Sequence, residues 1–181
     1  MAGTMVDDRT SRSNGWRIAG WGALASLLLL PAVAMQFTNE VNWDETDFIV
    51  MGAMLGALGL GAEFLFRRSG DWAYRLGAAA ALLTGFVTVW ANLAVGLIRS
   101  EDNPYNLLFI GVLALALIGA AAARFRPAGM ARATAAAAAL QALLAIGGMS
   151  SDMRGGVFSL FFAVPWVLSA ALFAAAARKR D

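Results

Sequence analysis

Residues 48–66 read FIVMGAMLGALGLGAEFLF, a run of apolar and small residues with one charged side chain, that of Glu63. Acidic residues precede this run, and Arg67 and Arg68 follow it directly. A helix that crosses the roughly 30 Å hydrocarbon core of a bilayer needs about 20 predominantly apolar residues. The run therefore predicts a membrane-spanning helix that ends at a basic turn.

The rest of the chain repeats this pattern of apolar runs separated by short charged islands. Of its 181 residues 60% are hydrophobic and 14% are charged, whereas soluble domains carry about 25% charged residues. No segment between the runs is long enough for a soluble domain. The six runs comprise residues 16–37, 48–66, 76–98, 107–123, 133–149 and 157–177. The sequence thus predicts an all-α polytopic transmembrane bundle at 16–177, with short cytoplasmic tails at 1–15 and 178–181.

Basic residues are distributed unevenly among the segments that join these runs. If the N-terminus is cytoplasmic, 12 of the 14 lysines and arginines lie in cytoplasmic segments, and Arg99 and Arg154 lie outside. Positively charged loops resist translocation across the membrane. We therefore expect a multi-pass protein with both termini in the cytoplasm. The alternative is cleavage of a signal peptide after Ala34, which would leave five helices and an external N-terminus.

The absence of two residue types restricts the chemistry that the chain can perform. The sequence contains no cysteine and no histidine, which excludes thiolate nucleophiles, disulfides, a Ser-His-Asp triad, and zinc or haem sites built on these ligands. Its one lysine, Lys179, follows the last apolar run. We expect a protein that is not an enzyme and has no cofactor or metal. We also expect no nucleic-acid partner, because the positive charges follow the membrane topology.

Two consecutive pairs of predicted helices resemble each other at a constant offset. Residues 66–70 correspond to residues 125–129, and Gly52 corresponds to Gly111. Each pair consists of a polar cap, a helix, a basic turn with glycine and an alanine-rich helix. Both pairs would run in the same direction, which predicts a parallel duplication of a helical hairpin about an axis along the membrane normal. The alternative is convergence, since any basic turn between apolar helices looks similar.

The predicted helix at 48–66 carries a stripe of small residues that ends in a carboxylate. Gly52, Gly56 and Gly59 recur at helical spacing and form a candidate packing seam, because membrane helices associate through small residues. Glu63 continues this stripe, and Arg67 follows four residues later in the favourable order for an ion pair. An intramembrane carboxylate is a functional candidate. We favour the other interpretation, a structural anchor that pairs with Arg67.

Further candidate positions lie within the later predicted helices. Thr84, Thr88 and Asn92 share one face, which could line a polar path but is better explained as a packing seam whose hydroxyls bond to their own helix. Gln141 is expected to form a hydrogen bond with an asparagine or threonine of the neighbouring hairpin. Pro165 is expected to break the last helix near its middle, among aromatic residues that pack together or contact a lipid or isoprenoid ligand.

The loops assigned to the outside carry the remaining polar signals. Arg99 and Arg154 are expected near helix C-termini, where the backbone dipole favours a cation. Asn103 followed by Pro104 is typical of an N-cap and a first helical position. The acidic residues of these loops could hold a calcium-like cation, although solvated carboxylates explain them better.

Two segments have a distinctive sequence. They are EVNW at 40–43, which leads into Asp47 and Phe48, and VWANLAVG at 89–96, which is followed by SEDNP at 100–104. Both resemble segments of a family of small bacterial inner-membrane proteins that has no assigned activity. The resemblance covers roughly residues 35–132. It implies a small protein of the bacterial inner membrane and implies nothing about catalytic or binding residues.

These observations favour a non-catalytic membrane protein, an accessory, assembly or scaffold subunit that associates with another membrane protein or with itself in the lipid bilayer. The alternative is a small carrier or channel for an ion, a lipid or a small hydrophobic solute, suggested by Glu63, Pro165 and the face at 84–92. An intramembrane enzyme acting on lipid is a third hypothesis, for which the sequence offers no paired catalytic carboxylates.

Overall fold

The computed structural model describes the backbone of residues 5–179 and the side chains of residues 15–179. Over this range the chain forms helices and no strand. In chain order these are α1 (Met5–Ala34), α2 (Glu45–Arg68), α3 (Trp72–Ala94), the 3₁₀ turn η1 (Pro104–Leu107), α4 (Leu108–Ala122), α5 (Pro127–Gly148), α6 (Met153–Phe161) and α7 (Ala163–Arg178). Residues 1–4 and 180–181, which belong to the predicted tails, lie outside the described residues.

Six segments of the described chain are long and apolar enough to cross a membrane. They are α1 from Gly15 onward, α2, α3, η1 together with α4, α5, and α6 together with α7. Continuous helices satisfy their own backbone hydrogen bonds, which is what a hydrocarbon environment requires. The predicted all-α fold with about six spanning helices is therefore confirmed, and the chain is a multi-pass helical membrane protein.

Several predicted boundaries are wrong, because the apolar runs mark the hydrocarbon layer whereas caps mark the ends of a helix. The predicted helix at 76–98 is shifted, since Asp71 caps α3 and the helix ends at Ala94. The predicted helix at 133–149 begins too late, because Pro127 occupies the first turn of α5, where its missing N–H is not needed. Residues 5–15 of the predicted N-terminal tail belong to α1.

The last spanning segment is interrupted as its proline predicts. α6 ends at Phe161 and α7 begins at Ala163, so the break lies at Phe162, three residues before Pro165. Pro165 cannot donate the backbone hydrogen bond that would join its turn to the preceding one. The predicted break is therefore present, and the apolar run at 157–177 lies in two shorter helices.

The chain divides into two compact units, Met1–Leu60 and Gly61–Asp181, and α2 contributes to both. In the first unit, side chains of α1 lie against the glycine stripe of α2. A Cβ atom added to Gly59 would lie 2.9 Å from Trp21 Cη2, and one added to Gly52 would lie 3.6 Å from Leu28 Cδ2. A Cβ atom on Gly56 would have no neighbour within 4 Å. Gly52 and Gly59 thus permit close packing against α1, whereas Gly56 does not face a neighbour.

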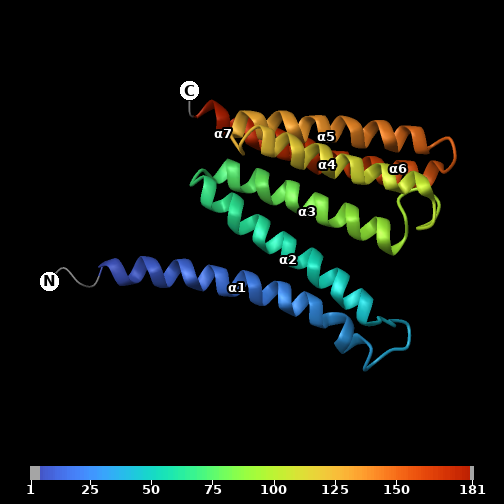
Figure 1. Ribbon diagram of the computed structural model, residues 1–181, viewed down its shortest axis with the longest axis horizontal. Coiled ribbons are helices and arrows are strands. Elements are labelled where there is room, and N and C mark those ends of the chain that lie inside the picture. The colour runs from blue at the N-terminus through green and yellow to red at the C-terminus, as the bar shows by residue number, and fades with distance from the viewer. Residues whose placement is uncertain (1–4, 180–181) are drawn as a thin grey trace. The chain divides into compact units, whose positions relative to one another are not determined.

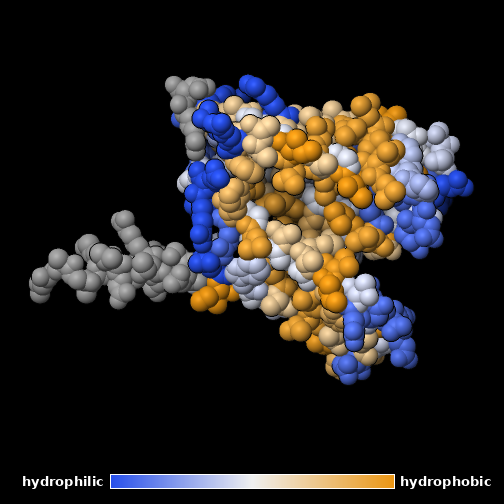
Figure 2. Space-filling view, in the orientation of Figure 1, coloured by the Kyte–Doolittle hydropathy of each residue, from blue (hydrophilic) through white to orange (hydrophobic). Residues whose placement is uncertain are grey.

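The second unit is a helical bundle in which α7 packs most extensively against α5 and α3, while α4 packs against α5 (Figure 1). Two clusters of buried side chains fill this bundle. One contains Tyr74, Met130 and Phe173, and the other contains Phe109 and Trp166. Apolar side chains also cover the middle of the visible face of the bundle, and hydrophilic side chains lie at its two ends (Figure 2).

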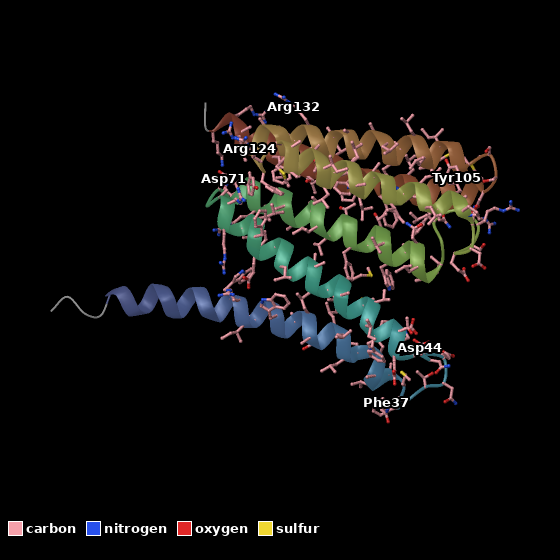
Figure 3. The ribbon with its side chains drawn as sticks, viewed as in Figure 1. Phe37, Asp44, Asp71, Tyr105, Arg124 and Arg132 are labelled. Carbon is pink, nitrogen blue, oxygen red and sulfur yellow. The ribbon has the colours of Figure 1, made fainter. Side chains whose placement is uncertain are left out.

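The two ends of this bundle differ in charge. We call one end the basic end, formed by the α2–α3 turn, the α4–α5 turn and the C-terminus of α7, and the other the loop end, formed by residues 95–104 and 149–152. Figure 3 shows Asp71, Arg124 and Arg132 at the basic end and Tyr105 at the loop end. The basic residues of the basic end are Arg67, Arg68, Arg75, Arg124, Arg126, Arg132, Arg178 and Lys179.

Small residues allow α4 and α5 to approach closely. A Cβ atom on Gly119 would lie 2.8 Å from Ala133 Cβ, and one on Gly129 would overlap the Cβ atom of Ala123. Gly129 lies in the first turn of α5, not in the turn between helices that the sequence suggests. The α4–α5 hairpin therefore depends on a glycine at 129, whereas the sequence predicts a packing role only for the glycines of α2.

The predicted duplication of a helical hairpin stays a prediction. Ala78 and Ala137, which correspond at the constant offset, are both fully buried. Gly52 lies against Leu28, but a Cβ atom on its counterpart Gly111 would have no neighbour within 4 Å. The corresponding helices α2 and α4 also differ in length, with 24 and 15 residues.

We expect Gly129→Ala to lower the free energy of unfolding by about 1–3 kcal/mol, because the added methyl group must displace Ala123 at the closest point of the α4–α5 hairpin. Gly111→Ala is the matched control, since its methyl group enters open space within α4 and should leave stability unchanged or raise it by up to about 1 kcal/mol. Unfolding in mixed micelles measures both. Equal effects of the two substitutions would show that the hairpin tolerates a wider separation.

Candidate functional site

Glu63 and Arg67 form the ion pair that their spacing predicts. Arg67 Nη2 lies 3.2 Å from Glu63 Oε2, and the two side chains are 68% and 23% exposed. Both belong to the last two turns of α2, next to the basic end. A partly exposed pair at the edge of the membrane contributes little to stability. Its geometry agrees with a structural anchor, the interpretation favoured from the sequence.

Thr84, Thr88 and Asn92 use their side-chain donors on their own helix. Thr84 Oγ1 donates to the carbonyl of Ala80 at 2.6 Å, and Thr88 Oγ1 donates to the carbonyl of Thr84 at 2.7 Å. Asn92 Nδ2 donates to the carbonyl of Thr88 at 2.9 Å. The two threonines are buried inside the bundle. The face therefore matches the packing seam expected from the sequence, with back-bonded hydroxyls.

Beyond this seam the chain leaves the helix and forms a folded loop. The helix does not reach Gly96, because α3 ends at Ala94 and Gly96 adopts a left-handed conformation with φ +70°. A Cβ atom at this position would overlap the backbone of Ser100. Leu97 and Ile98 follow and are fully buried. Two apolar side chains thus fill the bundle at its loop end.

Asn106 holds this loop in place through both atoms of its amide. Its Oδ1 accepts from the backbone N–H of Ile98 at 2.9 Å, and its Nδ2 donates to the carbonyl of Ser100 at 2.7 Å. Asn103 Nδ2 also donates to the carbonyl of Ile98, at 3.1 Å, and its own side chain caps η1, as its position before Pro104 predicts. These contacts supply partners to backbone groups that are not part of any helix.

Asp152 joins this loop to the start of α6. Its Oδ1 accepts from the backbone N–H of Gly155 at 3.0 Å, and its Oδ2 accepts from the backbone N–H of Arg99 at 2.8 Å. These two hydrogen bonds, from Gly155 first and then Arg99, lower the pKa of the Asp152 carboxyl below its ordinary value. The expected positions of Arg99 and Arg154 near helix C-termini are wrong, since Arg99 lies in the loop with φ 67° and Arg154 lies in the first turn of α6.

Gln141 connects α5 to the break in the last spanning segment. Its Nε2 donates to the backbone carbonyl of Ser159 at 3.0 Å and lies 3.2 Å from Ser159 Oγ, and both residues are fully buried. The expected asparagine or threonine partner is therefore wrong. The Ser159 carbonyl also accepts from Phe162 N–H, which lies at the break. A side chain of a neighbouring helix thus supports the backbone where regular helix is lost, as a break inside a membrane requires.

Ser169 makes a second contact of this kind, which the sequence analysis misses. Its Oγ donates to the carbonyl of Gly77 at 2.8 Å and joins α7 to α3. A Cβ atom on Gly77 would lie 3.3 Å from Phe173, so a small residue is needed for the approach. The signal in the sequence is a serine within an otherwise apolar run, and its partner depends on how the helices pack.

Aromatic residues near the break divide into exposed and buried side chains. The rings of Phe158 and Phe162 pack edge to face with centroids 5.3 Å apart, and Phe161 is 67% exposed. Trp166 is 2% exposed. Within the described part of the chain, three buried polar atoms have no hydrogen-bond partner: Asn92 Oδ1, Gln141 Oε1 and Trp166 Nε1.

Aromatic and charged contacts stabilise the basic end. The Arg68 guanidinium lies 4.5 Å from the centre of the Phe64 ring and 5.3 Å from that of Phe125. Tyr74 Oη donates to the carbonyl of Phe125 at 3.0 Å. This contact stabilises a turn in which both Arg124 and Phe125 have left-handed backbone conformations, with φ 51° and 58°, which non-glycine residues rarely adopt.

Asp71 pairs with the C-terminus of the bundle at the same end. Lys179 Nζ lies 3.0 Å from Asp71 Oδ2, and the Asp71 carboxylate also caps α3 through Tyr74 N–H. The hydrogen bond from Lys179, followed by that from Tyr74, lowers the pKa of Asp71.

The acidic residues of the loops assigned to the outside, the alternative cation site, do not converge. In residues 15–179 no three carboxylates lie close enough to hold a metal ion.

Replacement of Gln141 by leucine should lower the free energy of unfolding by about 0.6–2 kcal/mol, because the substitution removes an interhelical hydrogen bond next to a broken helix. Thr88→Val is the matched control. It removes a buried hydroxyl whose bond stays within α3, and we expect a change below about 0.5 kcal/mol. Unfolding in mixed micelles distinguishes them. A loss for Thr88→Val as large as that for Gln141→Leu would contradict the distinction between the two contacts.

We expect the backbone amides of the loop end to lose protection from hydrogen exchange in acid. Because the pKa of Asp152 is lower in the folded protein than the ordinary value of 3.8, its stabilisation is complete well above pH 3.8 and is lost as the pH falls through the lower folded value. We expect hydrogen exchange of the Ile98 and Arg99 amides, corrected for intrinsic rates, to accelerate in that range. In Asp152→Asn the exchange should already be fast at pH 7 and change little with acid. Unchanged protection in Asp152→Asn would refute the assignment.

Comparison of the chain with protein-family models, with curated proteins and with solved structures finds no match. The resemblance of residues 40–48 and 89–104 to a family of small inner-membrane proteins therefore stays a prediction, and the function has to be argued from the geometry described above.

Proposed function

We propose that the protein is a non-catalytic accessory, assembly or scaffold subunit of the bacterial inner membrane. One observation carries this proposal: four buried polar side chains of the bundle donate to backbone carbonyls of the chain itself. Thr84, Thr88, Gln141 and Ser169 all do so. A catalytic centre needs polar groups that converge on a substrate, whereas these groups bond within α3 or join neighbouring helices.

The distribution of charge supports the orientation that we propose. The basic end of the second unit holds eight of the chain's 14 basic residues, whereas the loop end holds Arg99, and Arg154 lies next to it in the first turn of α6. If positively charged segments remain in the cytoplasm, the basic end and the C-terminus face the cytoplasm. The same rule, applied to the basic residues before the first span, also assigns the N-terminus to the cytoplasm.

α1 is the part of the chain best suited to contact a partner. None of the residues of its spanning window from Gly15 to Ala34 is buried. Gly22 and Ser26 lie one helical turn apart and are exposed, and small residues at this spacing allow membrane helices to pack closely. We therefore propose that α1 associates with a helix of another membrane protein or of a second copy of this chain.

The alternative, a small carrier or channel, is favoured by a different observation. Asn92 Oδ1, Gln141 Oε1 and Trp166 Nε1 are buried and have no hydrogen-bond partner within the described residues, and the helix that contains Trp166 is broken nearby. Unsatisfied polar groups and broken helices are common along the pathways of transporters. The buried side chains of Leu97 and Ile98 argue against a path that opens at the loop end.

A photoreactive amino acid at position 26 on α1 should form a covalent adduct with protein in native membranes, because the proposal places a partner helix against this face. The matched control is the same probe at position 117 on α4, where Leu117 is 66% exposed and where we expect adducts with lipid only. An adduct of twice the subunit mass identifies a second copy of this chain, and any other mass identifies a different partner.

Two results would contradict the proposal. The first is a strictly monomeric protein in mild detergent whose position 26 forms adducts with lipid alone. The second is solute flux in proteoliposomes that falls sharply in Asn92→Leu, which would instead support the carrier or channel.

A further inference from the structure

Arg132 occupies an unusual position for a charged residue. It is the one charged residue of α5 and lies five residues after Pro127, or about 7.5 Å along the helix axis. Its side chain is exposed, and the positions that follow on the same helical face are exposed and apolar, including Leu143 at 67% and Ile146 at 57%. Charged residues in spanning helices usually face the protein interior, so an arginine on this outer face requires a specific explanation.

Most other cations of the basic end have partners within the chain. These partners are Glu63 for Arg67, Asp71 for Lys179, backbone carbonyls for Arg75, and the rings of Phe64 and Phe125 for Arg68. Among residues 15–179, by contrast, the side chains of Arg124, Arg126 and Arg132 have no ion pair, hydrogen bond or ring contact. Their positive charges are therefore available to a ligand.

The backbone brings these three arginines to one border of the bundle. Arg124 lies in the α4–α5 turn, whose left-handed conformation is supported by the Tyr74 hydrogen bond to Phe125, and Arg126 directly precedes α5. Helical side chains lean toward the N-terminus of their helix, and Arg132 shares its face of α5 with the small, exposed Ala128 one turn nearer to the same turn. Figure 3 shows Arg124 and Arg132 at the same end of the bundle.

We propose that Arg124, Arg126 and Arg132 bind the phosphate of an anionic phospholipid whose acyl chains lie along the exposed face of α5. A guanidinium group donates two parallel hydrogen bonds to phosphate oxygens, and it reaches the headgroup layer while its aliphatic stem stays in the apolar region. Three cations on one border favour a headgroup with net negative charge. The apolar face that continues from Arg132 to Ile146 distinguishes a lipid from a free anion.

The test compares two phospholipids with identical acyl chains, phosphatidylglycerol and phosphatidylcholine, added to the purified full-length protein in a neutral detergent. Native mass spectrometry and the melting temperature report binding. We expect phosphatidylglycerol to bind more tightly and to raise the melting temperature. Each of Arg126→Gln and Arg132→Gln should weaken its apparent affinity about fivefold, the change that corresponds to about 1 kcal/mol per basic residue, and the double variant roughly thirtyfold.

Matched variants separate a site from general attraction to positive charge. Arg154→Gln removes the same charge at the loop end and should leave the affinity for phosphatidylglycerol unchanged, whereas Arg132→Lys should retain most of it. The melting temperature without lipid shows whether each variant is folded. The proposal is overturned if both lipids bind equally, if Arg154→Gln weakens binding as much as Arg132→Gln, or if inorganic phosphate alone reproduces the stabilisation.

Discussion

Backbone amide and carbonyl groups inside a bilayer have no water to bind, and this constraint governs how the chain uses its polar side chains. Continuous helices satisfy the requirement by themselves. Where a helix is interrupted, at Phe162, Gln141 of a neighbouring helix donates to the Ser159 carbonyl. Ser169 similarly donates to the carbonyl of Gly77, where α7 and α3 approach closely. Hydrogen bonds to the backbone thus explain these polar residues within the membrane without a ligand.

The same constraint explains why side chains bond to the backbone at the loop end. The chain leaves α3 at Ala94 and inserts Leu97 and Ile98 into the bundle, which takes their amides and carbonyls out of reach of solvent. Asn106 and Asp152 replace the missing helical partners. These hydrogen bonds hold the loop against the end of the bundle. We therefore infer that a partner or a lipid binds elsewhere on the molecule.

Composition and local spacing predict much of this structure, and interactions between distant residues account for what they miss. Length and apolarity predict the six spans, and spacing along one helix predicts the Glu63–Arg67 pair and the back-bonded threonines. The contacts of Gln141 and Asp152 join residues on different helices or loops, so their partners depend on how the helices pack. The predicted helix ends differ from the observed ones because a charged residue can interrupt an apolar run without ending the helix. Arg132 is an example.

Arg132 lies inside α5 although the apolar run predicts that the helix begins at residue 133, and its position suggests a function. An arginine within the first two turns of α5 costs free energy if its guanidinium faces hydrocarbon, and the described chain offers it no partner. Position 132 could carry alanine, the commonest residue of α5, without loss of an ion pair or hydrogen bond among the described residues. The energetic reason for a cation at this site must therefore lie outside the polypeptide, and the phosphate layer of the membrane is the nearest source of negative charge that its side chain can reach.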